Sequence, residues 1–386
     1  MKKILFVIDS LNCGGAERSL LSLLSVLDST KYEKHLWVLH PGGVLDKVVP
    51  SDVTIEQQPV YNKLHHWLYR LAHAFFSVRW RQNRKKNHKC HHAEVFWQSC
   101  GFITKGLDKS FDIAVAYQQG IPTYLVASKI HARVKVAWIN TDIKSAGYDI
   151  PYNVSFYDKM HYIVCVSDML EGMVKGYMSQ FTDKIRCVYD IVSPEMVRKM
   201  ASEPVAELED CPSGRIVLTT VARMAYLKNY PLAVKTAALL RQRGLDFIWF
   251  FVGDGSKLGQ IRRMIHESHL NDCVLALGLR LNPYPYIKAC DIYVQTSLHE
   301  GFGLTIAEAK MLCKPIVSTN FEVVYNQLED GVNGLIAKMT PESLADAICT
   351  LANDSGMRTR YSSVLKGSVD NNASTELKKI EEMFLI

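Results

Sequence analysis

The sequence predicts an α/β protein of two domains, each a doubly wound parallel sheet with helices on both faces. Its 386 residues exceed what one hydrophobic core usually holds and suffice for two. Short apolar runs rich in β-branched residues alternate with longer segments of helical periodicity, which is the pattern of parallel strands joined by crossover helices. The alternation restarts near Gly214, so we expect a second domain to begin close to that point.

The first domain is expected over residues 1–200. It opens with an apolar strand at Lys2–Ile8 and a helix from about Ala16 to Leu27, in which leucines recur at helical spacing. Helical segments separate the strands that follow. The later strands are expected at residues 34–39, 113–117, 134–139 and 162–166.

The second domain is expected over residues 201–373, after a proline-containing linker at 202–213. Its strands are expected at residues 215–221, 247–252, 273–277, 291–295, 315–318 and 334–336. Its main helices are expected at residues 230–243, 284–289 and 341–351, and a further helix is expected to end at residue 265. We expect a closing helix at 374–386, with the first domain as the candidate surface on which it packs.

Composition favours an ordinary globular protein, with 48% hydrophobic and 22% charged residues. We expect no signal peptide, because the N-terminal residues lead straight into strand chemistry, and no apolar run reaches about 18 residues. The ten cysteines are scattered without a C-x-x-C pair, which is typical of reduced cysteines in a cytoplasmic protein. The cluster of His88, Cys90, His91 and His92 is a poor metal candidate, because adjacent ligands rarely close a site.

The net charge of +6 is concentrated in one window, residues 57–93, which holds eight Lys or Arg and no Asp or Glu. Aromatic and aliphatic residues recur there at helical spacing. Two interpretations are open: a helix over residues 63–89 that lies on an anionic membrane surface, or an amphipathic helix that covers its own domain. No nucleic-acid-binding module accompanies the charge, so we expect no nucleic acid partner.

The most informative stretch is His299–Lys310, which follows an apolar strand. Two glycines turn the chain there before a helix begins, and the first amides of a helix are free to bind an anion. Glu300 precedes the glycines and Glu308 is expected on the first helical turn. A purely structural alternative treats residues 305–308 as a capping box.

Three further loops follow predicted strands. Gly14 and Gly15 precede a helix and would let a ligand approach the backbone. Arg223 and Lys228, five residues apart, can converge on a diphosphate. The glycine-rich segment 253–259 is not a dinucleotide fingerprint, because its third glycine is one residue late, and it is better interpreted as a strand-end turn.

Together these motifs resemble those of the family-4 retaining glycosyltransferases, which belong to the group 1 glycosyltransferases. HEGFGLTIAEA is similar to the E-x7-E signature of the family, and Arg223 and Lys228 match its R-x4-K pair. CGGAERS, ACDIYVQTS and the LGL segment at 277–279 also match, and all occur in the order of the family. The resemblance implies the GT-B fold, two Rossmann-like domains that face a central cleft.

The resemblance also implies the roles of individual residues toward a nucleotide-sugar donor. Arg223 and Lys228 would neutralise the leaving diphosphate, Glu300 would contact the sugar, and Glu308 would accept from the ribose hydroxyls. The backbone contacts to the donor would come from the remaining site residues. These are Gly14, Gly15, Leu279, Gly301, Phe302, Gly303, Leu304 and Thr305. No metal or other cofactor is implied, because cationic side chains and helix amides supply the positive charge.

One position departs from the family. Many relatives carry a histidine where this chain has Asn140, and an amide cannot serve as a general base. Asn140 and Asp142 are therefore expected to orient the sugar or the acceptor.

We expect a retaining, metal-independent glycosyltransferase that uses a UDP-sugar and a saccharide or lipid-linked acceptor. Its expected setting is surface polysaccharide synthesis, in the cytoplasm or at the inner face of a bacterial membrane. A nucleotide-sugar epimerase or hydrolase of the same fold, or a nicotinamide-dependent enzyme, are the alternatives.

Overall fold

The computed structural model describes residues 1–12, 14–60, 62–85, 91–205, 207, 214–368 and 371–385. The chain folds into two compact units. Unit 1 comprises residues 1–190 and 376–386, and unit 2 comprises residues 191–375. None of the described helices combines the length and the hydropathy that a membrane span requires.

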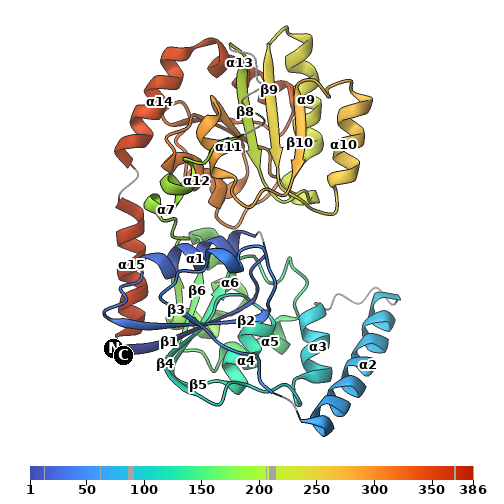
Figure 1. Ribbon diagram of the computed structural model, residues 1–386, viewed down its shortest axis with the longest axis vertical. Helices are drawn as coiled ribbons and strands as arrows, with labels where there is room; N and C mark the ends of the chain where they lie inside the picture. The colour runs from blue at the N-terminus through green and yellow to red at the C-terminus, as the bar shows by residue number, and fades with distance from the viewer. Residues whose placement is uncertain are drawn as a thin grey trace. The chain divides into compact units, whose positions relative to one another are not determined.

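Unit 1 contains a seven-stranded sheet in the order β3-β2-β1-β4-β5-β6-β7 (Figure 1). All its described strand pairs are parallel, and β1 and β2 start in register with Lys2 opposite Tyr32. The strands are β1 (Lys2–Ser10), β2 (Tyr32–His40), β3 (Val53–Ile55), β4 (Ser110–Ala116), β5 (His131–Ile139), β6 (Tyr162–Cys165) and β7 (Ile185–Cys187). The helices are α1 (Gly15–Val26), α2 (Lys63–Lys85), α3 (His92–Cys100), α4 (Ile121–Lys129), α5 (Ile150–Tyr157) and α6 (Asp168–Tyr177).

Unit 2 contains a six-stranded parallel sheet in the order β10-β9-β8-β11-β12-β13 (Figure 1). The strands are β8 (Ile216–Val221), β9 (Phe247–Val252), β10 (Val274–Gly278), β11 (Ile292–Gln295), β12 (Ile316–Thr319) and β13 (Gly334–Ala337). The helices are α7 (Pro194–Met200), α9 (Tyr230–Gln242), α10 (Leu258–Glu267), α11 (Tyr284–Ala289), α12 (Leu304–Met311), α13 (Pro341–Asn353) and α14 (Ser355–Ser368). All six residues of β9 are buried, as expected of a strand covered on both faces.

Each sheet reverses its winding direction once, and this fixes where a ligand is expected. In unit 1 the chain winds outward from β1 to β3 and then returns to β4 on the other side of β1. In unit 2 the corresponding reversal lies between β8 and β11. Ligands of open α/β sheets bind beyond the carboxyl ends of the strands at this switch point.

The closing helix α15 (Asn371–Phe384) packs on unit 1 through its C-terminal half. Ile380, Met383 and Phe384 are buried, and the Phe384 ring makes an edge contact with Tyr32 at 6.0 Å. The Lys2 ammonium donates to the Phe384 carbonyl at 2.6 Å, which places the two chain ends side by side (Figure 1).

Two features differ from the sequence-based expectation. The units divide after Asp190 rather than at residue 200, because α7 packs against α11 and α12 and Asn282 donates to the Met200 carbonyl at 2.7 Å. Strands β3 and β7 were not expected, since three residues at a sheet edge carry too little of the alternating pattern. Most of the expected linker at 202–213 lies outside the described residues.

Candidate functional site

The loops that follow β8 and β11 are joined at the switch point of unit 2. The Thr296 hydroxyl donates to the Lys228 carbonyl at 2.8 Å, and the Leu298 amide donates to the Leu227 carbonyl at 2.8 Å. These two bonds fix the loop that carries Lys228 against the loop that carries Glu300. The structure therefore brings together two of the residues that the sequence singles out.

Glu300 is the centre of this network and is almost completely buried. Its Oε2 lies 2.5 Å from the Lys228 ammonium, and the Glu300 side chain is 10% exposed. Its Oε1 accepts from Gln295 Nε2 at 2.7 Å and from the Ser297 hydroxyl at 2.6 Å. Gln295 Oε1 in turn accepts from Tyr293 at 2.9 Å. The carboxylate is thus held in one orientation by Gln295 on β11, by Ser297 in the loop that follows, and by the cation of the β8 loop.

The N-terminus of α12 lies next to this network. Gly303 caps the helix at φ +87°, a left-handed conformation that favours glycine, so the turn has a local reason for this residue. The Gln327 side chain donates to the carbonyls of Phe302 and Gly303 and thereby anchors the turn. Among the described residues, none accepts from the backbone amides of Gly303, Leu304 and Thr305. These amides are oriented as a helix N-terminus presents them to an anion.

Glu308 is not a helix cap, so the capping-box alternative is wrong. The helix begins at Leu304 with Gly303 as its cap, and its first turn contains no acidic residue. Glu308 lies in the second turn, where it is 1% exposed and accepts from the Tyr284 hydroxyl at 2.9 Å. A carboxylate at this depth requires a reason other than helix capping.

Arg223 lies in the same loop as Lys228 but is exposed, and no described residue pairs with its guanidinium. Its loop is held by the segment after β9. A Cβ at Gly253 or Gly255 would lie 2.0 Å from the Ala222 carbonyl oxygen or 2.4 Å from that of Met224, so only glycine permits this approach. The glycines therefore form a turn at the end of a strand, as expected from the sequence. This turn supports the loop that carries Arg223.

The other predicted donor residues of unit 2 lie at or near the same edge. Gly301 is half-buried and Phe302 is buried in the turn that leads into α12. Leu279, in the loop after β10, is 37% exposed. Tyr284, Tyr293, Gln295, Ser297 and Gln327 form hydrogen bonds within this network or its turn, and the sequence did not single them out. A signal existed for Gln295, a polar side chain in an otherwise apolar buried strand.

In unit 1, Gly14, Gly15 and Asn140 lie beyond the carboxyl ends of β1 and β5. Asn140 Nδ2 donates to the Tyr117 carbonyl at 2.8 Å, while its buried Oδ1 has no donor among the described residues. Asp142 accepts from the Tyr177 hydroxyl at 3.0 Å and from groups within its own loop. Burial raises the pKa of Asp142, but these hydrogen bonds lower it further than burial raises it. Asp142 thus holds its loop together.

An unpredicted pair, Asp9 and His40, lies at the same edge of unit 1. The His40 Nδ1 is 3.2 Å from Asp9 Oδ1, and both side chains are exposed. The hydrogen bond to Asp9 raises the pKa of His40. Asp9 is the last residue but one of β1 and His40 is the last residue of β2, a proximity that sequence periodicity alone does not reveal.

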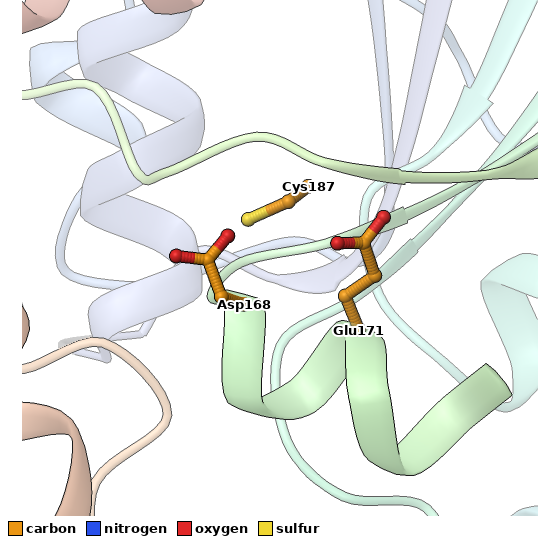
Figure 2. A group of neighbouring side chains, drawn as sticks. All are labelled: Asp168, Glu171 and Cys187. Carbon is orange, nitrogen blue, oxygen red and sulfur yellow. The ribbon is translucent and has the colours of Figure 1, made fainter. Parts of the chain in front are cut away.

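Asp168, Glu171 and Cys187 form a cluster whose ligand atoms lie within 4.8 Å of one another (Figure 2). Each group already has a partner. The Tyr189 hydroxyl donates to Asp168, and the Lys175 ammonium lies 3.0 Å from Glu171. Burial, with the hydrogen bond to Asp168, raises the pKa of the Cys187 thiol, which therefore stays protonated. The cluster is accounted for as a hydrogen-bonded part of the fold.

The histidine cluster near residue 90 is described in part, because His88 and Cys90 lie outside the described residues. The His91 ring stacks on Tyr148 with centroids 3.8 Å apart, and its side chain accepts from the Ala93 amide. Burial lowers the pKa of His91 to about 4. His91 is thus a neutral N-cap of α3.

Comparison with known proteins finds a family model that matches part of the chain. Residues 208–364 match the model of the glycosyl transferases group 1, and this segment contains Arg223, Lys228, Glu300 and Glu308. The chain is 22% identical over 352 residues to the lipopolysaccharide core biosynthesis glycosyltransferase LpsD of Rhizobium meliloti, covering 90% of this chain and 88% of LpsD. It is 26% identical over 216 residues to the N-acetylgalactosamine-N,N'-diacetylbacillosaminyl-diphospho-undecaprenol 4-alpha-N-acetylgalactosaminyltransferase of Campylobacter jejuni, covering 55% of this chain and 54% of that protein.

Several curated relatives, the Campylobacter protein among them, are matched over about a third to a half of their length. The solved structure of Anabaena HepE, in complex with UDP and glucose, superposes with a TM-score of 0.71 at 17% identity and covers 99% of both chains. At this identity the likeness shows the fold alone, which is GT-B. Residues 208–364 of the chain thus match the group 1 glycosyltransferases.

Proposed function

We propose that the protein is a retaining glycosyltransferase that moves a sugar from a UDP-sugar to a hydroxyl group of a saccharide or lipid-linked acceptor. The observation that carries the proposal is the Lys228–Glu300 pair beside the α12 N-terminal amides, which have no acceptor in the described part of the chain. Such an arrangement offers positive charge for a diphosphate and an oriented carboxylate for a sugar.

Each residue has a proposed part in the reaction. Arg223, Lys228 and the amides of Gly303, Leu304 and Thr305 stabilise the negative charge that develops on the leaving diphosphate. Glu300 contacts the donor sugar, Glu308 accepts from the ribose hydroxyls, and the Leu279 backbone meets the base. Two side-chain cations and a helix N-terminus do what a divalent metal does elsewhere, so we propose that no metal takes part. The parts of Gly14, Gly15 and Asn140 stay predictions of the family resemblance.

The names of the relatives support the choice of donor and acceptor. HepE was solved with UDP and glucose, and the Campylobacter relative is named for a diphospho-undecaprenol acceptor. LpsD is named for lipopolysaccharide core biosynthesis. We therefore propose a part in bacterial surface polysaccharide synthesis at the cytoplasmic face of the membrane.

The test is donor binding followed by donor turnover. Thermal shift with uridine, guanosine and adenosine diphosphate sugars should identify one stabilising donor, and that donor should be hydrolysed slowly without an acceptor. Nuclear magnetic resonance of the first sugar released should show the anomeric configuration of the donor. Absence of stabilisation by every donor would contradict the proposal, and a donor epimerised without acceptor would favour the epimerase.

A further inference from the structure

Helix α2 has two apolar faces, and the domain covers one of them. Ala72 and Phe76 are buried in a small core with Val95 and Cys100 of α3 and with Ile103. Figure 1 shows α2 running along α3 at the border of unit 1. The inner face therefore packs on its own domain, as one of the two interpretations of the basic window expected.

The second face of α2 is exposed. It is a stripe of six large apolar side chains, spaced three or four residues apart so that they lie on one side of a helix. The outer stripe consists of Leu64, Trp67, Leu68, Leu71, Phe75 and Val78. Trp67 is 58% exposed and Phe75 is 61% exposed. A contiguous apolar surface of this kind on a folded protein marks an interaction site.

The charges beside the outer stripe indicate what covers it. At 3.6 residues per turn, Lys63, Arg70 and Arg81 fall along one border of the stripe. Arg79 falls on the other border, where it donates to Gln98 at 2.6 Å. No acidic residue occurs in residues 57–93. A two-fold contact between copies of this chain would bring the basic border against itself, so the charge favours an anionic surface over a second copy.

We propose that α2 lies on an anionic lipid bilayer with its outer stripe in the interface. Trp67, Leu71 and Phe75 enter the boundary between headgroups and acyl chains, and the basic border contacts lipid phosphates. The proposal concerns binding alone and needs neither donor nor acceptor, so it stands or falls separately from glycosyl transfer.

The placement of α2 gives this surface a use. The Trp80 ring, near the C-terminal end of α2, contacts His92 at 5.1 Å, and His91 stacks on Tyr148. The Tyr148 hydroxyl lies 2.8 Å from where a Cβ of Gly120 would be, and Gly120 is in the loop after β4 at the switch point of unit 1. The C-terminal end of α2 therefore adjoins the sheet edge where ligands bind. A bilayer under α2 would run beside that edge, as a lipid-linked acceptor requires.

The test is flotation of the full chain with vesicles of phosphatidylcholine alone or with about 30% phosphatidylglycerol. We expect binding to the anionic vesicles that weakens at high salt. Leu71→Asp with Phe75→Asp should lower the partition coefficient at least about tenfold. Lys63→Gln with Arg70→Gln and Arg81→Gln should lower it about fivefold per charge.

Matched controls separate the surface from general effects. Phe102→Asp with Tyr325→Asp changes two side chains that are 74% and 61% exposed elsewhere, and should bind as the unmodified chain does. Lys235→Gln with Arg263→Gln and Lys288→Gln removes three exposed charges of unit 2 and should also retain binding. Circular dichroism checks that every variant is folded.

Three results would overturn the proposal. The first is failure of the unmodified chain to float with anionic vesicles. The second is equal binding by the outer-stripe variant and its control. The third is a dimer in sedimentation velocity that the Leu71→Asp, Phe75→Asp variant converts to a monomer while vesicle binding is absent.

Discussion

The two sheets have the same strand order around their switch points. They differ in how firmly the polar side chains at these edges are held. In unit 2, Glu300 is bound by Lys228, Gln295 and Ser297, and backbone bonds join the two loops. In unit 1, Asp142 is held by Tyr177 and its own loop, but the Asp9 and His40 side chains are exposed and pair only with each other among the described residues. The common fold therefore does not determine the chemistry, which depends on the loops.

This difference indicates separate tasks. A site that stabilises charge in a transition state works best when its groups are already oriented, as they are around Glu300. An edge with exposed groups can accept varied ligands and is fixed only when one binds. We infer that the proposed donor chemistry lies in unit 2 and that unit 1 adapts to the acceptor.

The largest effect is expected from Arg223→Ala, which removes an exposed cation from the edge of unit 2 where we propose that the donor binds. Donor hydrolysis should fall about 100- to 1000-fold, as when one stabilising donor is lost from an oxyanion site. The melting temperature should be unchanged, because the guanidinium has no partner among the described residues. Arg263→Ala, at an exposed position on α10, is the control. Full activity of Arg223→Ala would remove the diphosphate assignment.

Glu300→Gln should reduce hydrolysis about 100-fold, because the charged partner of Lys228 is lost while the shape is kept. Steady-state kinetics should show the loss mainly in kcat. Glu322→Gln, an exposed carboxylate on another loop, should have no effect. Normal kcat in Glu300→Gln would assign the network to stability alone.

Glu308→Gln should weaken donor binding at least about tenfold, since a charged hydrogen bond is worth about 1.5–3 kcal/mol. Unfolding should change little, because glutamine can still accept from the Tyr284 hydroxyl. Titration calorimetry with the donor measures the loss. Unchanged affinity would contradict the ribose contact.

Asp190→Asn tests the buried interior behind the edge of unit 1. Asp190 is 8% exposed, and burial raises its pKa from 3.8 to about 6, although the Ser19 hydroxyl at 2.5 Å lowers it. The folded state therefore holds the proton more tightly, and stability falls as the pH rises from about 4 to 6. At pH 7 the free energy of unfolding of the variant should exceed that of the unmodified chain by about 2–3 kcal/mol. At pH 4 the two free energies should be about equal. Urea titrations at both pH values check this, and equal stabilities at pH 7 would contradict the raised pKa.

His40→Gln should leave donor affinity unchanged, which is the smallest expected effect. The pKa of His40 is raised by Asp9, so the pair adds stability at low pH that is lost as the pH rises through that pKa. The contribution is small because both groups are exposed. A fivefold change in donor Kd by calorimetry would place donor chemistry at the edge of unit 1.

Most strands of both sheets could be predicted because they are continuous apolar runs, and β9 is the plainest case. The residues that we propose to bind the donor could be located because they follow strands and match family motifs of fixed spacing. The start of α12 could not be predicted, since it depends on the positive φ of Gly303, and periodicity carries no information on that angle. This is why Glu308 was expected one turn too early.

The partners of a carboxylate were also beyond the sequence. Tyr284 reaches the Glu308 carboxylate from α11, and Lys228 reaches Glu300 from the loop after β8, so only the folded chain brings these partners together. For α2 the sequence shows apolar residues around much of the helix but not which of them α3 covers. The structure resolves this by burying Phe76 and exposing Phe75.

We propose that the α12 N-terminus beside Glu300 binds the diphosphate of the donor. Amide hydrogen exchange of the full chain, with and without saturating UDP-sugar, tests this directly. We predict slower exchange at Gly303, Leu304 and Thr305 in the presence of the donor, and loss of this protection in Arg223→Ala. Unchanged exchange at these three amides when the donor is bound would contradict the claim.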